Sequence, residues 1–199
     1  MNAPTIDNRV AVLILQHPQE QDRALGTARL LCDTLANARL VVGLSWRNLG
    51  HAWGEATESK DWGVLYLGSA RAAGRGPLVA LDRKGAPHSD QEAARAVLRG
   101  IVVLDGNWSQ AKTLWWRNPW LTRLRRFVIV PDRRSLYGDL RREARPDAVS
   151  TLEAVALALA ALEGHELRES LLAPLREMVA KARAAGIRDT ARRDRRIRR

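Results

Sequence analysis

The 199-residue chain is poor in cysteine and phenylalanine, with one residue of each. A single cysteine, Cys32, excludes an internal disulfide and any zinc site built from a cysteine cluster. No apolar run approaches the roughly 20 residues that a membrane-spanning helix needs. The N-terminus has no basic segment followed by an apolar one, so we expect no secretory signal. These absences favour a cytoplasmic protein without a membrane partner, and the length suits one domain with a sizeable core.

Negative charge is scarce in two parts of the chain. Residues 1–111 hold 12 Lys and Arg against 11 Asp and Glu, whereas residues 112–145 hold 10 against 3 and residues 181–199 hold 9 against 2. Arg dominates both basic blocks, and its planar guanidinium matches the geometry of phosphate. A polyanionic partner such as RNA explains both blocks. The alternative is a solubilising tail together with a solvated helix face.

Short apolar runs alternate with helix-like stretches along the chain. The runs lack period-two alternation, which is typical of strands that are buried on both faces of a parallel sheet. They cover residues 10–15, 40–44, 64–67, 78–81, 101–104 and 127–130. The helix-like stretches cover residues 19–33, 90–98, 107–116, 150–162 and 169–185. We therefore expect one α/β domain over residues 1–185, with a mostly parallel sheet and helices on both of its faces.

Two segments have too little apolar character to form such elements. Residues 186–199 are an Arg-rich tail that cannot bury a core, so we expect it to be disordered. Residues 68–76 contain only Gly, Ser, Ala and Arg and are interpreted as a loop that could order on a ligand.

Asp105-Gly106-Asn107-Trp108 joins the fifth apolar run to a helix-like stretch. Ligands of open α/β sheets bind just beyond the carboxyl ends of the strands, where Asp105 would lie. Gly106 would let the chain pass close to such a ligand. The alternative is that Asp105 or Asn107 only caps the helix, as short polar side chains do.

Two further segments offer polar groups near helix starts. Ser150 and Glu153 have the spacing of a capping box, and the free amides of that helix could also receive a carboxylate. Near the N-terminus, His17 could act as a base or a phosphate ligand and Glu20 as an acid. Their position favours a plain strand-to-helix turn that begins at Pro18.

Tryptophan is abundant, with seven residues, and several of them lie within the internal basic block. Trp108, Trp115 and Trp116 have a spacing that could place them on one core-facing side of a helix. Trp120 follows Pro119 and is the better candidate for stacking on a base of single-stranded RNA.

Taken in order, these segments resemble the DTW-domain family, over roughly residues 10–180. The family's Asp-x-Thr-Trp element stands here as Asp105 to Trp108, and its Ser-Thr-x-Glu-Ala element is matched in full by Ser150 to Ala154. A His-Pro-x-Glu element is matched from His17 to Glu20 and is followed by Gly26-Thr27. A Ser-x-Tyr segment leading to Leu-Arg is echoed by residues 135–141.

Three features depart from the family pattern. Asn107 replaces the threonine of the name-giving element, although asparagine also donates and accepts hydrogen bonds. The segment between Tyr137 and Leu140 carries one extra residue, Gly138 or Asp139. The N-terminal cysteine cluster of many relatives is missing, so no metal is expected.

The resemblance implies an enzyme that uses S-adenosyl-L-methionine (SAM) as a substrate. Family members transfer its 3-amino-3-carboxypropyl group to N3 of a tRNA uridine and release methylthioadenosine. The resemblance also implies a SPOUT-like fold with a trefoil knot near the SAM site. The alternatives are a SPOUT-type SAM-dependent RNA methyltransferase and a non-catalytic RNA-binding protein.

The resemblance assigns roles to particular residues. Asp105 is expected to take the N3 proton or to orient the base. The SAM site is expected to be formed by Leu104, Gly106, Trp108, Ser150, Thr151 and Glu153. Contacts with tRNA are expected from Arg133, Arg134, Arg141 and Trp120.

Overall fold

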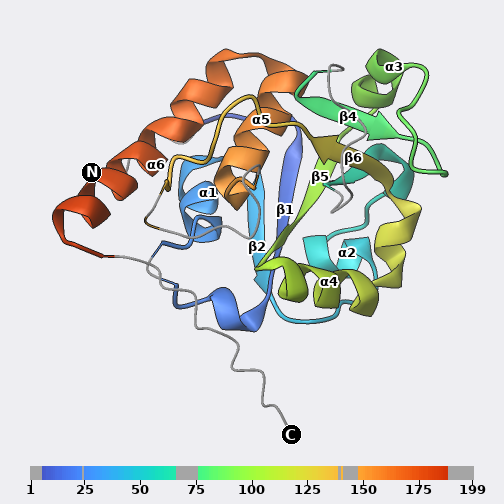
Figure 1. The fold of residues 1–199 in the computed structure, drawn as a ribbon. Helices are drawn as coiled ribbons and strands as arrows, with labels where there is room; N and C mark the ends of the chain where they lie inside the picture. The colour runs from blue at the N-terminus through green and yellow to red at the C-terminus, as the bar shows by residue number, and fades with distance from the viewer. Residues whose placement is uncertain (1–5, 24, 66–75, 139, 141–147, 188–199) are drawn as a thin grey trace, which may run out of the picture.

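The computed structural model describes residues 6–23, 25–65, 76–138, 140 and 148–187, and its centre is a six-stranded sheet (Figure 1). The strands are β1 Ala11–Gln16, β2 Ala38–Val42, β3 Trp62–Leu65, β4 Leu78–Leu81, β5 Gly100–Asp105 and β6 Arg125–Ile129. Their order is β2-β1-β5-β3-β6-β4, and only the β4–β6 pair is antiparallel. The mostly parallel sheet is confirmed, and each of the six expected runs overlaps one strand.

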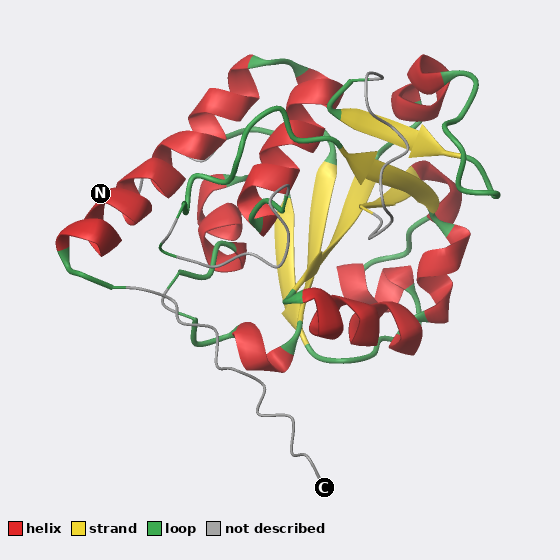
Figure 2. Ribbon diagram, in the orientation of Figure 1, coloured by secondary structure: helices red, strands yellow, loops and turns green. Residues whose placement is uncertain are grey.

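Helices cover both faces of this sheet (Figure 2). They are α1 Ala28–Thr34, α2 Leu49–Trp53, α3 Gln91–Ala96, α4 Trp108–Arg117, α5 Thr151–Glu163 and α6 Glu166–Ala184. Three 3₁₀ turns accompany them: η1 Pro18–Glu20, η2 Ser59–Asp61 and η3 Pro119–Arg123. One core lies between the sheet and α1, α5 and α6, and a second lies between the sheet and α2, α4 and η3.

Alternate residues of each central strand enter the two cores. In β1, Val12 and Ile14 belong to the first core, whereas Leu13 and Leu15 belong to the second. Successive side chains of a strand point to opposite faces, so a strand that is covered on both faces needs apolar residues throughout. This explains why the expected runs were continuous rather than alternating.

The expected helix over residues 19–33 is wrong in its first half, since η1 ends at Glu20 and α1 begins only at Ala28. Two tertiary contacts hold the stretch between η1 and α1 in place. The carbonyl of Leu25 accepts the buried hydroxyl of Tyr137, and the hydroxyl of Thr27 accepts an amide of α5. Both groups therefore bond to distant parts of the chain.

The short helix α2 was not expected from the sequence. Its first turn is capped by Asn48, whose side chain accepts the amide of His51 at 2.8 Å. It ends at Gly54 in the left-handed region, at a φ of 95°, as helices commonly do. Within the described part of the chain, no helix combines the length and apolar character that a bilayer span requires.

Gly100 is a position where the sheet tolerates no side chain. It lies opposite Trp62 of β3, and an added Cβ would lie 2.5 Å from the buried indole. We expect Gly100→Ala to lower the free energy of unfolding by about 1–3 kcal/mol, because overpacking a filled core forces side chains from their preferred rotamers. Urea unfolding followed by circular dichroism measures this change. In a Trp62→Leu background the same substitution should be better tolerated, and an equal effect in both backgrounds would contradict this explanation.

Candidate active site

The carboxyl ends of β1 and β5 place Gln16 and Asp105 side by side. The two residues are in register, and the Gln16 side-chain amide donates to Oδ2 of Asp105 at 2.8 Å. Asp105 continues the alternation of Ile101 and Val103, so it faces α5 rather than α4. There the hydroxyl of Thr151, the first residue of α5, donates to its Oδ1 at 2.5 Å. Asp105 is only 9% exposed, and its two oxygens join three elements of the fold.

Helix α4 is capped by Asn107 and not by Asp105. The Asn107 side chain accepts the amide of Gln110 at 3.1 Å, and the Gln110 side chain accepts the amide of Asn107 at 2.6 Å. This is a complete capping box. The cap that the sequence offered to either residue is therefore made by Asn107, and the Asp105 carboxylate binds Gln16 and Thr151.

The N-terminus of α5 begins with the expected capping box of Ser150 and Glu153. The Glu153 carboxylate does more than cap, because it also accepts the Ser135 hydroxyl and the Leu136 amide, each at 2.7 Å. The Leu152 amide donates to Thr27 at 3.3 Å, and the Glu153 amide to Ser150 at 3.2 Å. Both amides are bound within the protein, so the expectation of free amides for a carboxylate is corrected for Leu152 and Glu153.

The hydroxyl of Tyr137, bonded to the Leu25 carbonyl, adds a further link between the segment after β6 and the N-terminal part of the chain. Four segments singled out in the sequence thus meet around the start of α5: residues 16–27, 105–107, 135–137 and 150–153. Gln16 and Thr27 are polar, buried and central to this arrangement, although neither residue was assigned a role from the sequence. A polar side chain that ends a wholly apolar strand was the available signal for Gln16.

The remaining expected SAM ligands lie at the same sheet edge. Leu104 is buried in the second core, on the α4 side of β5. An added Cβ on Gly106 would approach Cβ of Gln110 to 2.8 Å and Cβ of His17 to 3.5 Å, so its small size is already required by packing. Trp108 is exposed at the start of α4.

His17 accepts the Gln19 amide through Nδ1 at 3.3 Å, as expected of a turn residue.

The structure corrects the assignment of the tryptophans. Trp120 is only 7% exposed and its indole donates to the Trp46 carbonyl at 3.0 Å, so base stacking by this residue is wrong. η3 follows α4 directly and turns Trp120 inward. Trp116 was expected on the core side with Trp108 and Trp115, yet it is 77% exposed. Trp115 alone of the three packs against the second core.

The expected RNA-binding arginines follow β6. Arg133 and Arg134 are exposed, and Arg133 lies 3.4 Å from a carboxylate oxygen of Glu169. Arg141 lies outside the described residues, as do residues 68–75 of the expected loop and residues 188–199 of the expected tail.

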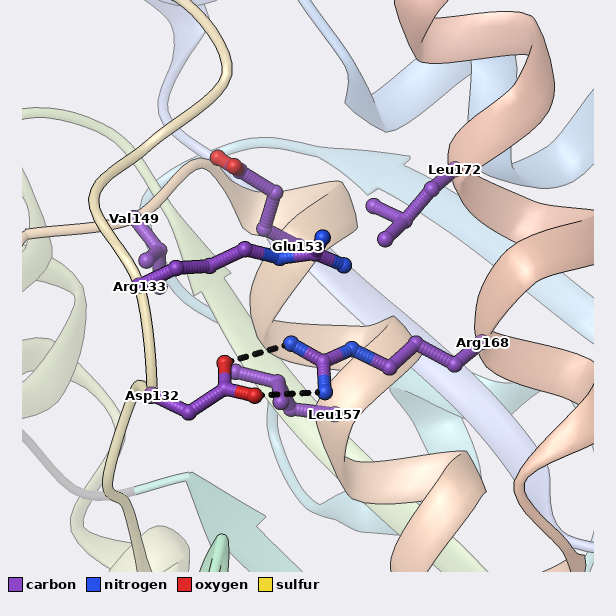
Figure 3. Close-up of a pocket in the computed structure, with 7 residues that line it drawn as sticks. All are labelled: Asp132, Arg133, Val149, Glu153, Leu157, Arg168 and Leu172. Atoms are coloured by element: carbon purple, nitrogen blue, oxygen red, sulfur yellow. Dashed lines mark hydrogen bonds and ion pairs between the residues drawn. The ribbon is translucent and has the colours of Figure 1, made fainter.

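A hollow between α5, α6 and the segment after β6 is lined in part by Arg133 (Figure 3). Arg168 crosses it and binds both oxygens of Asp132, at 2.8 and 2.5 Å. This hydrogen-bonded guanidinium lowers the pKa of the Asp132 carboxyl. Leu157 and Leu172 line the hollow beside Glu153. The arrangement fastens the segment after β6 to both helices.

Neither thiol chemistry nor a metal centre is indicated near this edge. Burial raises the pKa of Cys32 to about 11, so the thiol is protonated at neutral pH and unsuited to nucleophilic attack. Among the described residues, no three His, Cys, Asp or Glu side chains gather in a way that could hold a metal ion.

The sequence profile of the DTW domain matches residues 2–183, which include all four converging segments. The chain belongs to the DTW-domain family. The tRNA-uridine aminocarboxypropyltransferase 2 of Drosophila melanogaster is 32% identical over 168 residues, 82% of this chain and 61% of the relative. The mouse protein of the same name is 32% identical over 167 residues, 83% of this chain and 52% of the relative.

The DTW domain described here is thus shorter than the curated relatives that it matches. It spans 52–61% of the length of these two proteins. A third protein of that name, from Macaca fascicularis, is 28% identical over 167 residues. No solved structure matches the chain.

Replacement of Glu153 tests how firmly the site is held. Glu153→Gln introduces an amide nitrogen that must face either the Leu136 amide or the Ser150 amide and Ser135 hydroxyl. We expect a loss of about 1.5–3 kcal/mol in the free energy of unfolding, because a buried donor loses a charged acceptor. Urea unfolding measures it, with Glu58→Gln at an exposed position as the matched control. Equal stability of the two variants would disprove this anchoring role.

Proposed function

We propose that the chain transfers the 3-amino-3-carboxypropyl group of SAM to N3 of a uridine in tRNA and releases methylthioadenosine. One observation carries the proposal: the family's motif segments converge on Asp105, held at the carboxyl edge of the sheet by Gln16 and Thr151. The activity after which the two 32%-identical relatives are named supports it. The SPOUT-like fold and its knot belong to this proposal too, since residues 141–147, on the path from β6 to α5, lie outside the described residues.

SAM supplies a carbon activated by its bond to a positively charged sulfur, and the group that leaves is neutral. The protein therefore needs little help for the leaving group. It must remove or polarise the proton on N3 and hold the nitrogen close to that carbon.

Asp105 is our candidate for the proton acceptor or for the group that orients the base. Each carboxylate oxygen can accept two hydrogen bonds, and Gln16 and Thr151 each occupy one. One acceptor site per oxygen is left for the uridine imide. The two donors also fix the plane of the carboxylate, which is the kind of support from neighbouring groups that a precise site requires.

The groups expected to hold SAM fit this edge in part. The positive end of the α5 dipole is suited to the SAM carboxylate. The Leu152 and Glu153 amides are already bound, and the single proton of the Thr151 hydroxyl is donated to Asp105, so Thr151 would line the SAM site without donating to the carboxylate. Leu104, Gly106 and Trp108 border the same edge and would contact its apolar parts. Ser150 and Glu153 are assigned to positioning, because the side chain of each accepts the backbone amide of the other and the Glu153 carboxylate also binds the segment after β6.

The activity is tested by incubating the purified protein with SAM and an unmodified tRNA transcript, followed by mass spectrometry of nucleosides and small molecules. Aminocarboxypropyl-uridine together with methylthioadenosine supports the proposal. A methylated nucleoside with S-adenosylhomocysteine would assign the methyltransferase alternative. Retained tRNA binding without any product, and without a need for SAM, would favour the non-catalytic alternative.

Substitutions at Asp105 and Thr151 test the role of the carboxylate. Asp105→Asn should lower kcat by about 10²–10⁴-fold, the usual contribution of a positioned acid or base. Thr151→Val should lower it roughly 10–100-fold, because it removes a hydrogen bond to a charged group, while Thr151→Ser keeps the hydroxyl and the activity. Single-turnover rates at saturating SAM and tRNA measure the effects, and thermal melts check folding. Full turnover by folded Asp105→Asn would refute the assignment.

Arg134 tests the expected contact with the phosphate backbone. Arg134→Ala should weaken tRNA binding and reduce the slope of log K against log salt by roughly 0.7–0.9, as expected when one phosphate contact is lost. Filter binding between about 50 and 200 mM salt measures the slope. Arg99→Ala is the matched control, since its exposed side chain lies at the opposite end of β5. A slope unchanged from the wild type would remove Arg134 from the interface.

A further inference from the structure

The outer side of α4 carries a stripe of two tryptophans and a lysine. Trp108, Lys112 and Trp116 are four residues apart, so they lie along one side of the helix over about 12 Å. Trp116 is 77% exposed, and Trp108 is also exposed. The Lys112 ammonium lies 5.4 Å from the centre of the Trp108 ring, a cation–π contact. We call these three residues the α4 outer face.

The α4 outer face sits on a rigid support. The opposite side of the helix is packed in the second core through Ala111 and Leu114, and its start is fixed by the Asn107 capping box. At its end, the fully buried Asn118 side chain donates to the carbonyls of Leu44 and Leu114, at 3.0 and 2.8 Å. The exposed indoles are therefore held in place by the helix, although neither the core nor the caps require the Trp116 ring.

The surroundings of this face are basic. Residues 106–131 contain no Asp or Glu, while they contain Lys112, Arg117, Arg123, Arg125 and Arg126. Arg117 and Arg123 are exposed at the end of α4 and in η3. A second copy of the chain is a poor occupant, because a two-fold contact would bring together the cations of residues 106–131, a segment that contains no carboxylate. Exposed aromatic rings beside the exposed cations Lys112, Arg117 and Arg123 instead match a single-stranded nucleic acid.

We propose that the α4 outer face binds unpaired nucleotides of the substrate RNA, with a base stacked on Trp116 and Lys112 near a phosphate. The proposal rests on the proposed function for the identity of the RNA. α4 begins three residues after Asp105, so RNA on this face leads directly to the carboxyl edge of the sheet. Trp120 is buried and cannot stack on a base, so we assign the stacking role to the exposed Trp116.

The first experiment measures binding of an unmodified tRNA transcript to full-length variants at fixed salt. Trp116→Ala should weaken binding roughly 5- to 100-fold, in line with the loss of one stacked base. Trp116→Phe keeps an aromatic ring and should stay close to the wild type, whereas Trp116→Leu should resemble Trp116→Ala. Val97→Ala, at an exposed apolar position after α3, is the control and should bind normally. Melting temperature should be unchanged in all Trp116 variants.

The second measurement concerns charge. Lys112→Ala should reduce the slope of log K against log salt by roughly 0.7–0.9, while Lys84→Ala, exposed in the turn after β4, should have no such effect. Equal tRNA affinity of the wild type and Trp116→Ala would overturn the proposal. If Trp116→Leu bound tRNA as tightly as Trp116→Phe, stacking on an aromatic ring would be disproved. Loss of self-association in light scattering, with tRNA affinity unchanged, would assign the face to a second copy.

These measurements distinguish a failure of the proposed RNA-binding surface from a failure of the proposed reaction. If no transfer product forms but Trp116→Ala still weakens tRNA binding, the α4 outer face stands and the proposed reaction fails. If product forms and Trp116→Ala leaves the KM for tRNA unchanged, the reaction stands and the surface fails.

Discussion

The buried carboxylate of Glu153 is the interaction on which the geometry of the candidate site depends. A carboxylate removed from water is costly unless hydrogen bonds replace its hydration. Here the Ser150 amide, the Ser135 hydroxyl and the Leu136 amide do so. These bonds tie the segment after β6 to the first turn of α5. Because Thr151 lies in this first turn, the position of the turn determines where the Thr151 hydroxyl meets Asp105.

Asp105 is a second buried carboxylate that depends on hydrogen bonds, and it lies at the carboxyl edge of the sheet. Its neighbours in β5 are apolar and buried on both faces, so the end of the strand is the first place where a carboxylate can reach polar partners. Gln16 ends the neighbouring strand β1 at the same level and provides one of them. Parallel pairing thus brings two polar strand ends together, and the helix above supplies the third group. Three side chains from distant segments form the candidate site, which no single segment contains.

The sequence predicted the sheet well because burial on both faces leaves a direct mark, a continuous apolar run. It also predicted the capping box at Ser150, because capping depends on residues three apart. It did not predict that Glu153 binds Ser135 and Leu136, since that contact depends on how β6 and α5 pack. Nor did it predict that Asn107 would cap α4 while Asp105 turned to α5, because both residues suit a cap. That choice follows from strand alternation, which fixes the face of Asp105.

The tryptophans of α4 show a second limit of helical periodicity. Their spacing suited one core-facing side of a helix, yet Ala111 and Leu114 face the sheet and Trp116 faces solvent. A helix can approach a sheet closely only where its contacting side chains are small, so the alanine marks the inner side better than the tryptophans do. Beyond Arg117 the chain changes to a 3₁₀ turn, and the α-helical period no longer applies to Trp120.

The carboxylate proposed for the reaction and the surface proposed for RNA binding lie on opposite faces of the sheet, beyond the end of β5. The side chain of Asp105 points to the α5 face, while the chain itself continues into α4 on the other face. RNA held along α4 would therefore have to turn a base over the carboxyl edge of the sheet to reach Asp105. An unpaired nucleotide can make that turn at little cost, whereas a base in a duplex must first be unstacked. On this geometry, selection of unpaired uridines would come from the distance and direction between Trp116 and Asp105 as much as from contacts with the base.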